Sequence, residues 1–272
     1  MPETVSTLSG PGRKPSYRDL VQTLEGRQKT NKGASAYARW VNRPLGRRLA
    51  ALAHLAGLTP NQVTGISALC SAAGLVLIMA GPVAWATGVA AAFLLVLGYA
   101  LDAADGALAR LRGGGTFAGE WLDHVVDAGK MALVHLAVLV GWWRGSDLSE
   151  AWLAAPLVYE FIAVVFFFTI VLTDQLRRAH RGSAQMRLAG EGSSSVAYSV
   201  AVLPTEYGVL ALAFTLWGTP TVFAYCYLGL LACNAAFISL ALPKWYREVK
   251  TFGSVGPKTP AEGRPLPAES EN

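Results

Sequence analysis

Apolar residues form long uncharged blocks in this chain, and short basic or glycine-rich segments separate the blocks. The longest block, residues 61–101, contains no charged side chain. A run of about 20 apolar residues is long enough to cross a bilayer as a helix. Because backbone groups in lipid must hydrogen-bond within their own segment, such runs form helices. The pattern therefore predicts an all-α integral membrane protein.

Six membrane-spanning helices are predicted from the breaks between these blocks. Thr59 and Pro60 are a helix-start signal in front of the first span. Gly81 with Pro82, and the three glycines at 113–115, are turn signals. The predicted spans cover residues 60–80, 83–112, 117–143, 151–178, 195–217 and 220–245.

An amphipathic helix is predicted over residues 34–57, in front of the first span. Arg39, Arg43 and Arg47 recur at every fourth position on one face. Basic helices of this kind lie in the plane of the membrane interface, whereas a solvated surface helix is the plainer alternative. The apolar residues of the other face are Tyr37, Val41, Leu45, Leu52 and Leu55.

Both ends of the chain differ in composition from this membrane domain, which we predict to cover residues 34–250. Residues 1–33 and 251–272 are rich in proline, glycine and polar side chains. Such segments bury too little apolar surface to fold alone. We predict a disordered arm and a disordered tail, with a short helix in the arm around residues 17–25.

Composition agrees with a membrane protein, because 53% of the residues are hydrophobic and only 15% are charged. The net charge of +5 is attributed to loops that face anionic lipid on the cytoplasmic side, not to nucleic-acid binding. Lysine and arginine gather in the amino arm, after the second and fourth spans, and after the sixth. This distribution predicts that both termini are cytoplasmic, in the cell membrane.

Four aspartates follow the longest apolar block. Asp102 and Asp105 are three residues apart, and Asp123 and Asp127 are four apart. At these spacings each pair shares one face of a helix. The triple glycine between the pairs predicts that their helices are antiparallel neighbours, which brings all four carboxylates together at the cytoplasmic border.

Four like charges at that depth repel each other and resist desolvation. Divalent cations relieve both problems, and carboxylates prefer hard ions such as Mg²⁺, Mn²⁺ or Ca²⁺. Charges that merely end two helices at the interface are the alternative. His124 is one position off the face of Asp123 and is not counted as a ligand.

The residues around the aspartates carry a resemblance to a known family. Gly106 and Gly119 leave room for a ligand, and the Arg110 guanidinium suits a phosphate. The order Asp102-x2-Asp105-Gly106-x2-Ala109-Arg110-x8-Gly119-x3-Asp123-x3-Asp127 resembles the signature of the CDP-alcohol phosphotransferases at every fixed position.

This resemblance implies a transferase of phospholipid biosynthesis, which moves a substituted phosphate from a CDP-alcohol to another alcohol and releases CMP. It implies Asp102, Asp105 and Asp123 as ligands of two ions, Mg²⁺ or Mn²⁺. Asp127 would be the general base and a further ligand. It also implies a homodimer. The residues implied for the CDP site are Gly106, Ala109, Arg110, Gly119, Asn61 and Thr64.

The acceptor site is less defined. Lys130 shares the face of Asp123 and Asp127, so it binds either an acceptor phosphate or the acidic cluster itself. Arg177, Arg178 and Arg181 suit a phosphorylated polyol, or serve only as cytoplasmic charges. Glu160 and Glu206, inside the fourth and fifth predicted spans, either line a lipid or acceptor path or form interhelical hydrogen bonds.

Residues 33–44 loosely resemble the branch of the family that uses inositol phosphate. This makes CDP-diacylglycerol the expected donor and inositol phosphate the expected acceptor. Glycerol 3-phosphate as acceptor, or a soluble CDP-alcohol with a lipid acceptor, remain alternatives. Outside this enzyme class, a divalent-cation transporter or a structural membrane protein are rivals, although transporters place their sites nearer the midplane.

Overall fold

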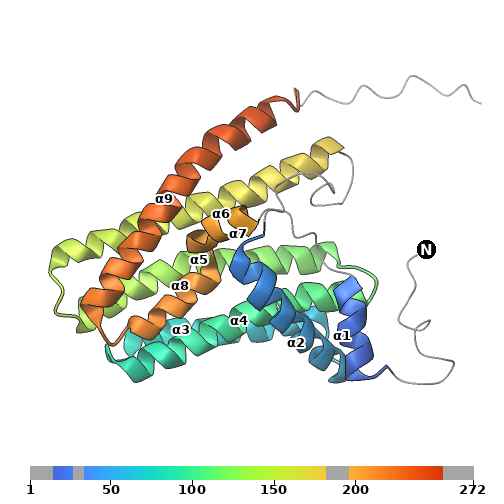
Figure 1. Ribbon diagram of the computed structural model, residues 1–272, viewed down its shortest axis with the longest axis horizontal. Coiled ribbons are helices and arrows are strands. Elements are labelled where there is room, and N and C mark those ends of the chain that lie inside the picture. Colours follow the sequence, from blue (N-terminus) through green and yellow to red (C-terminus); the bar gives the residue numbers. More distant parts are fainter. Residues whose placement is uncertain (1–14, 27–33, 182–195, 254–272) are drawn as a thin grey trace, which may run out of the picture.

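The computed structural model describes residues 15–26, 34–181 and 196–253. These residues are almost entirely helical (Figure 1). A π-helical turn at Ala38–Asn42 leads into α2, and a 3-10 turn at Glu150–Leu153 leads into α6. The helices are α1 (Tyr17–Gly26), α2 (Arg43–Leu55), α3 (Pro60–Ala80), α4 (Trp85–Leu111), α5 (Phe117–Gly145), α6 (Ala154–Arg181), α7 (Val196–Ala201), α8 (Tyr207–Ala213) and α9 (Pro220–Lys250).

Five of these helical segments, not six, are long and apolar enough to cross a membrane within the described residues: Pro60–Ala80, Trp85–Leu111, Phe117–Gly145, Glu150–His180 and Pro220–Lys250. Figure 1 shows α3, α4 and α5 lying along the long axis of the molecule, with α9 inclined to them. The predicted start of the first span is confirmed. There Thr59 and Gln62 form a reciprocal capping box, with Thr59 N donating to Gln62 Oε1 over 2.8 Å.

A single continuous span over 195–217 is not confirmed, and residue 195 lies outside the described part. The structure instead has α7, a 3-10 turn at Leu203–Thr205, and α8. Pro204 in that turn lacks an N–H and clashes with the preceding helical turn, so it breaks the helix. Its carbonyl is satisfied from α9, because Asn234 Nδ2 donates to Pro204 O over 3.2 Å.

Small residues bring α3 and α4 together. Ser67 Oγ donates to Gly98 O over 2.8 Å, so the side chain of one helix reaches the backbone of the other. A Cβ at Gly98 would lie 3.1 Å from Ser67 O and 3.2 Å from Ser71 N. Small residues at such positions allow membrane helices to approach closely. The α3–α4 pair is therefore a rigid base for the residues at the end of α4.

Gly98→Ala is expected to lower the thermal stability of the detergent-solubilised protein, by roughly 1–3 kcal/mol of unfolding free energy. The added methyl meets backbone atoms of α3 that have no room to yield. Gly65→Ala is the matched control, because a Cβ there meets nothing within 4 Å. Equal melting temperatures for the two variants would show that this close approach contributes no stability.

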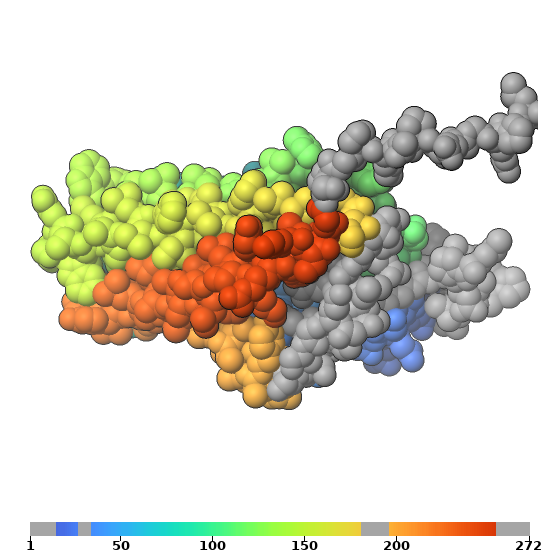
Figure 2. All heavy atoms as spheres, turned by 90° about the horizontal axis from the view of Figure 1, so that it is seen from above, coloured from blue at the N-terminus to red at the C-terminus, as the bar shows by residue number. Residues whose placement is uncertain are grey.

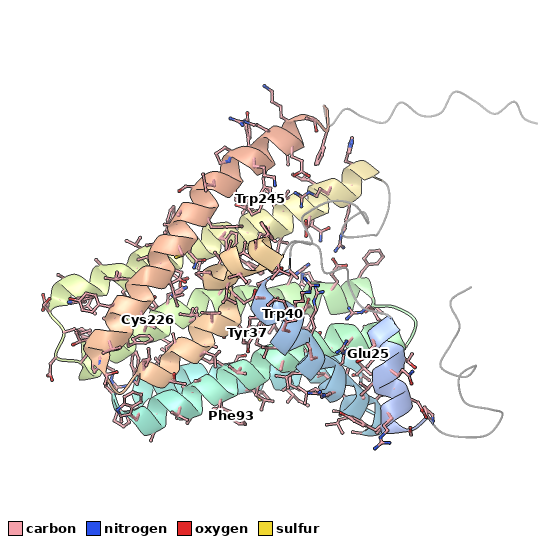
Figure 3. All side chains as sticks on the ribbon, in the orientation of Figure 1. Glu25, Tyr37, Trp40, Phe93, Cys226 and Trp245 are labelled. Atoms are coloured by element: carbon pink, nitrogen blue, oxygen red, sulfur yellow. The ribbon has the colours of Figure 1, made fainter. Side chains whose placement is uncertain are left out.

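The segment before the first span packs across α4, and this corrects the predicted face of one residue. Tyr37 is buried, not on the outer apolar face with Leu52 and Leu55. Its ring lies directly against the backbone of Gly208 in α8, and Figure 3 shows it inside the helical assembly. Leu52 and Leu55 remain exposed, each by 52%. A position in the membrane interface stays a prediction.

Within the arm predicted to be disordered, the structure describes α1, close to the short helix expected around 17–25. Leu20 and Leu24 of α1 are buried in a cluster with Ala50 and Ala53 of α2. The remaining disorder predictions fall on residues 1–14, 27–33 and 254–272, which lie outside the described residues.

Large apolar side chains cover much of the outer surface. Leu69, Phe93, Phe161 and Leu240 are each exposed by more than 60%, and Phe93 points outward in Figure 3. Figure 2 shows α9 lying beside α6 along one face of the elongated molecule. A soluble protein rarely exposes so much apolar surface, whereas lipid tails cover it at no cost.

Candidate functional site: an acidic cluster between α4 and α5

The turn between α4 and α5 depends on glycine. Gly113 and Gly114 have φ angles of +100° and +133°, which other residues rarely adopt. Thr116 then caps α5, since its Oγ1 accepts from Gly119 N over 3.0 Å. The two helices each pack on α3 and make few direct contacts with each other. The backbones of α4 and α5 are therefore not packed directly on each other, and the two helices meet through polar side chains such as Asp102 and Lys130.

Three of the four aspartates converge. Asp102 of α4 and Asp123 and Asp127 of α5 each offer a carboxylate oxygen, and these atoms lie within 4.8 Å of one another. Asp105 lies outside this group. It is buried, and its Oδ2 accepts a hydrogen bond from Thr64 Oγ1 over 2.6 Å. The predicted cluster of four is therefore a group of three with Asp105 beside it.

Lys130 supplies positive charge to this group. Its Nζ lies 2.5 Å from Asp102 Oδ1 and 2.6 Å from Asp127 Oδ1, and its side chain is 7% exposed. Of the two roles left open by the sequence, this contact matches a partner of the acidic cluster. An acceptor-binding role for Lys130 remains untested.

The donor set fits a divalent cation of the hard class. Two ligands on opposite sides of Mg²⁺ are about 4.2 Å apart, and around Ca²⁺ up to about 5 Å. The separations of up to 4.8 Å thus need only small side-chain adjustments. An ammonium between two of the carboxylates shows that the site already requires positive charge. Asp102, Asp123 and Asp127 are the residues that would hold the ion.

Lys130→Met is expected to destabilise the metal-free protein by about 1–3 kcal/mol, because it leaves two partly buried carboxylates without their counter-charge. Adding Mn²⁺ should then raise the melting temperature of this variant more than that of the original protein. Lys244→Met, at an exposed position on α9, is the control and should change neither value. If Lys130→Met without metal is as stable as the original protein without metal, Lys130 does not act as the counter-charge of the acidic cluster.

A cavity of about 250 Å³ opens next to the acidic cluster. The motif residues on its wall are Asp102, Asp105, Gly106, Arg110 and Asp123. Of the other residues predicted for the CDP site, Ala109, Gly119, Asn61 and Thr64 are not among its lining residues in the described chain.

Three of these four residues have contacts that place them relative to each other or to the site. Asn61 Oδ1 lies 3.2 Å from the point where a Cβ of Gly119 would be, so the pair is adjacent. Thr64 reaches the site through Asp105. Whether Ala109, Gly119, Asn61 and Thr64 contact a nucleotide remains a prediction.

The sequence reasoning missed the opposite wall of the cavity. Asn42, Arg43 and Arg47, from the π-helical turn and α2, line it together with Tyr99 of α4. The sequence predicts Arg43 and Arg47 on the basic face of an amphipathic interfacial helix, without a cavity opposite them. Burial lowers the pKa of the Arg43 guanidinium, although the charges of Tyr99 and Glu206 oppose this shift. The spacing of the arginines at every fourth residue is visible in the sequence. Which helix their face packs against is not.

Comparison of the sequence with known protein families identifies the family to which the chain belongs. A family model described as CDP-alcohol phosphatidyltransferase matches residues 57–246, more than half of the chain. The chain belongs to the CDP-alcohol phosphatidyltransferase family. The family and the apolar helices together make it a multi-pass membrane protein.

A curated relative gives a more specific likeness. The chain is 38% identical over 107 residues to a protein of Corynebacterium glutamicum named phosphatidylinositol phosphate synthase. The match covers 37% of this chain and 44% of that protein. The chain therefore spans less than half of the length of the relative that it matches.

In this member of the family, the basic residues predicted for the acceptor form ion pairs. Arg177 Nε lies 2.6 Å from Glu248 Oε1 of α9, and Arg177 Nη1 lies 2.7 Å from Asp174 Oδ1. Arg178 pairs with Glu120 of α5. These pairs join the ends of α5, α6 and α9 near the acidic cluster. The side chain of Arg181 lies outside the described residues.

The two glutamates within the predicted spans are each partly buried and differ in their surroundings. Glu206, at the start of α8, accepts a hydrogen bond from the Tyr99 hydroxyl of the cavity wall. This matches the interhelical hydrogen bond considered for it. Glu160 Oε2 is buried and has no hydrogen-bond partner among the described residues.

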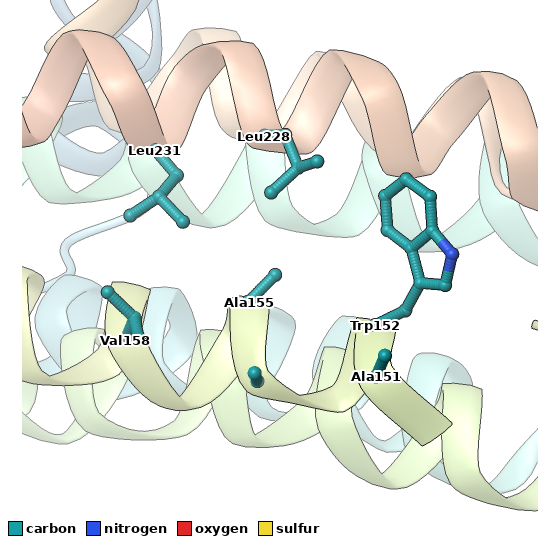
Figure 4. A pocket seen from close by; sticks show the side chains of 7 residues that line it. Ala151, Trp152, Ala155, Val158, Leu228 and Leu231 are labelled. Atoms are coloured by element: carbon teal, nitrogen blue, oxygen red, sulfur yellow. The ribbon is translucent and has the colours of Figure 1, made fainter. Parts of the chain in front are cut away.

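A larger cavity, of about 370 Å³, lies between α6 and α9. Trp152, Val158, Leu228 and Leu231 line it, and Figure 4 shows their side chains between the two helices. Its lining offers no titratable group. It therefore has no place in the chemistry of the acidic cluster.

Proposed function

We propose that this protein is a membrane-embedded transferase that moves the phosphatidyl group of CDP-diacylglycerol to inositol phosphate and releases CMP. Family membership supports the reaction class. The likeness to a protein named phosphatidylinositol phosphate synthase supports the acceptor. The observation that carries the proposal is the convergence of Asp102, Asp123 and Asp127 beside a cavity with motif residues on its wall.

In the proposed reaction an acceptor hydroxyl attacks the phosphorus that carries diacylglycerol. The new phosphorus–oxygen bond forms as the bond to the CMP phosphate oxygen breaks, and CMP leaves with that electron pair. Asp127 takes the proton of the hydroxyl as general base. Bound divalent cations, proposed as two Mg²⁺ or Mn²⁺, would neutralise the diphosphate and the charge on the leaving group.

The chain's own residues position the reactants. Asp102, Asp123 and Asp127 hold the metal on two helices, with Asp105 proposed as a further ligand and at present fixed by Thr64. Gly106, Ala109, Arg110 and Gly119, with Asn61 and Thr64, are proposed for the nucleotide. Lys130, Arg177 and Arg178 are proposed for the acceptor phosphate.

The proposed setting is the cell membrane, with both termini and the acidic cluster on the cytoplasmic side. Water-soluble substrates then reach the cavity, while the lipid tails stay among the helices. We also propose a homodimer. The distribution of lysine and arginine supports this orientation, and the family supports an enzyme over a cation transporter.

Release of CMP by the purified protein tests the proposal. The protein in detergent is given CDP-diacylglycerol and Mn²⁺, with inositol phosphate, glycerol 3-phosphate, inositol or serine in separate reactions. Rapid release is expected with inositol phosphate alone. Release with glycerol 3-phosphate would replace the proposed acceptor. Release only from a soluble CDP-alcohol with a lipid acceptor would replace the donor.

A further inference from the structure

The cavity beside the acidic cluster has one wall that does not come from the sequence motif. Asn42 and Arg43, at the junction of the π-helical turn and α2, face the same space as Gly106 and Arg110 of α4. These positions lie outside the residues matched by the family model, which begin at 57. The chemistry of this wall therefore needs its own explanation.

The place of α2 against α4 is fixed by a close contact. A Cβ at Gly46 would lie 2.8 Å from the Cβ of Ala103 and 3.1 Å from its carbonyl carbon. Ala103 itself lines the cavity and is next to Asp102. Gly46 is three residues after Arg43, so the two share one helical face. The contact thus holds Arg43 at the cavity while α2 crosses the motif helix.

The charge of this wall indicates an anionic ligand, and its hydrogen bonding indicates a ligand that also carries a donor. Arg43 and Arg110 line the same cavity, and an anion in that cavity can accept hydrogen bonds from both guanidinium groups. Asn42 is 5% exposed, and its amide oxygen has no hydrogen-bond partner among the described residues. A buried polar atom of this kind needs a partner, and a nucleotide offers N–H and O–H donors.

We propose that Arg43 binds a phosphate of the donor nucleotide in the cavity beside the acidic cluster, so that the helix before the first span completes the donor site. This inference rests on the proposed function, because it takes the donor to be a CDP-alcohol. A guanidinium binds phosphate through two parallel hydrogen bonds. Arg43 therefore orients the diphosphate as well as attracting it.

Arg48 of the same helix provides the comparison. It is exposed and is not part of the cavity wall. A general attraction to anionic lipid would involve both arginines equally, because such attraction depends on charge near the membrane surface. Phosphate binding in the cavity involves Arg43 alone.

The test measures binding of CDP and of cytidine to the full chain in detergent micelles with Mn²⁺. Arg43→Ala is expected to weaken CDP binding about tenfold to a hundredfold, the size of a lost charged hydrogen bond, and to leave cytidine binding unchanged. Arg43→Lys should fall between, since it keeps the charge but loses the fork. Arg48→Ala should bind both ligands as the original protein does.

Kinetics and vesicle binding separate the remaining explanations. Arg43→Ala should raise the KM for CDP-diacylglycerol and leave the KM for the acceptor unchanged. Phosphatidylglycerol vesicles lacking CDP-lipid should bind Arg43→Ala and Arg48→Ala equally. Vesicle binding lost in Arg43→Ala together with unchanged CDP binding would assign Arg43 to lipid headgroups and overturn the inference.

The outcomes distinguish this inference from the proposed function. If the original protein binds no CDP, the proposed function fails first. If it binds CDP and Arg43→Ala binds it equally well, the inference alone is overturned. Equal losses for CDP and cytidine would also overturn it, because they indicate a structural role. If Arg43→Ala does not fold, Arg43→Lys replaces it in the test. A weaker CDP affinity of Arg43→Lys then supports the inference, and an unchanged CDP affinity overturns it.

Discussion

Asp123→Asn is expected to reduce CMP release on the order of 10³-fold, because it removes one charged ligand from the group of three. A metal ion that neutralises transferring phosphate contributes several kcal/mol, and each 1.36 kcal/mol is about tenfold in rate. The asparagine keeps the shape of the side chain, so helix packing stays intact. The rate of CMP release at saturating substrate and varied Mn²⁺ measures the effect.

Asp147→Asn is the control for this prediction. Asp147 is exposed in the connection between α5 and α6, at the other end of α5 from the cluster. The same chemical change there should leave the rate within about twofold, since exposed charges contribute little. An Asp123→Asn enzyme with more than a tenth of the original rate would show that the reaction does not depend on this cluster.

Asp127→Asn is expected to lower kcat by about 10²- to 10⁴-fold, the usual contribution of a general base. If proton transfer is the main role of Asp127, Asp127→Asn should weaken metal binding less than Asp123→Asn does. The measurement pairs kcat with the rise in melting temperature that Mn²⁺ causes. Because Asp127 also contacts Lys130, the melting temperature without metal must be recorded as well.

The two aspartate variants thus separate base from ligand. A lost kcat with a retained Mn²⁺ effect identifies Asp127 as the base. Loss of both makes it chiefly a ligand. Full activity in Asp127→Asn would exclude both roles and would move the proton acceptor to another group.

The parts of the fold that the sequence predicted depend on local chemistry. Thr59 and Gln62 form a capping box that starts α3 where it was expected. The glycines after α4 form the predicted turn, where Gly113 and Gly114 adopt positive φ angles. The aspartate spacings placed Asp123 and Asp127 on one face because helical periodicity holds along α5. In each case the determining residues lie within a few positions of each other.

The parts that were missed depend on contacts between distant segments. Apolar content alone indicated a span over 195–217, but Pro204 breaks it, and Asn234 of α9 donates a hydrogen bond to the Pro204 carbonyl. The role of Arg43 depends on which side of α2 packs on α4, and Gly46 decides this by its contact with Ala103. An amphipathic pattern shows that a face is polar, but not whether lipid headgroups or a cavity lie opposite.

The separation of α4 from α5 also follows from packing. Both helices use α3 as their common support, and the small residues of α3 determine how close α4 comes. The carboxylates of the two helices therefore meet across a space and not within a tight helix pair. That arrangement leaves room for a metal ion and a diphosphate, which directly packed helices would exclude.

The position of bound Mn²⁺ tests the central claim most directly. Crystals of the full chain with Mn²⁺ would reveal the ion by its anomalous scattering. The account predicts a peak within bonding distance of Asp102, Asp123 and Asp127, with the Lys130 ammonium moved away from the carboxylate oxygens. A peak elsewhere, or an unchanged Lys130 contact at saturating Mn²⁺, would contradict the assignment of this cluster as the metal centre.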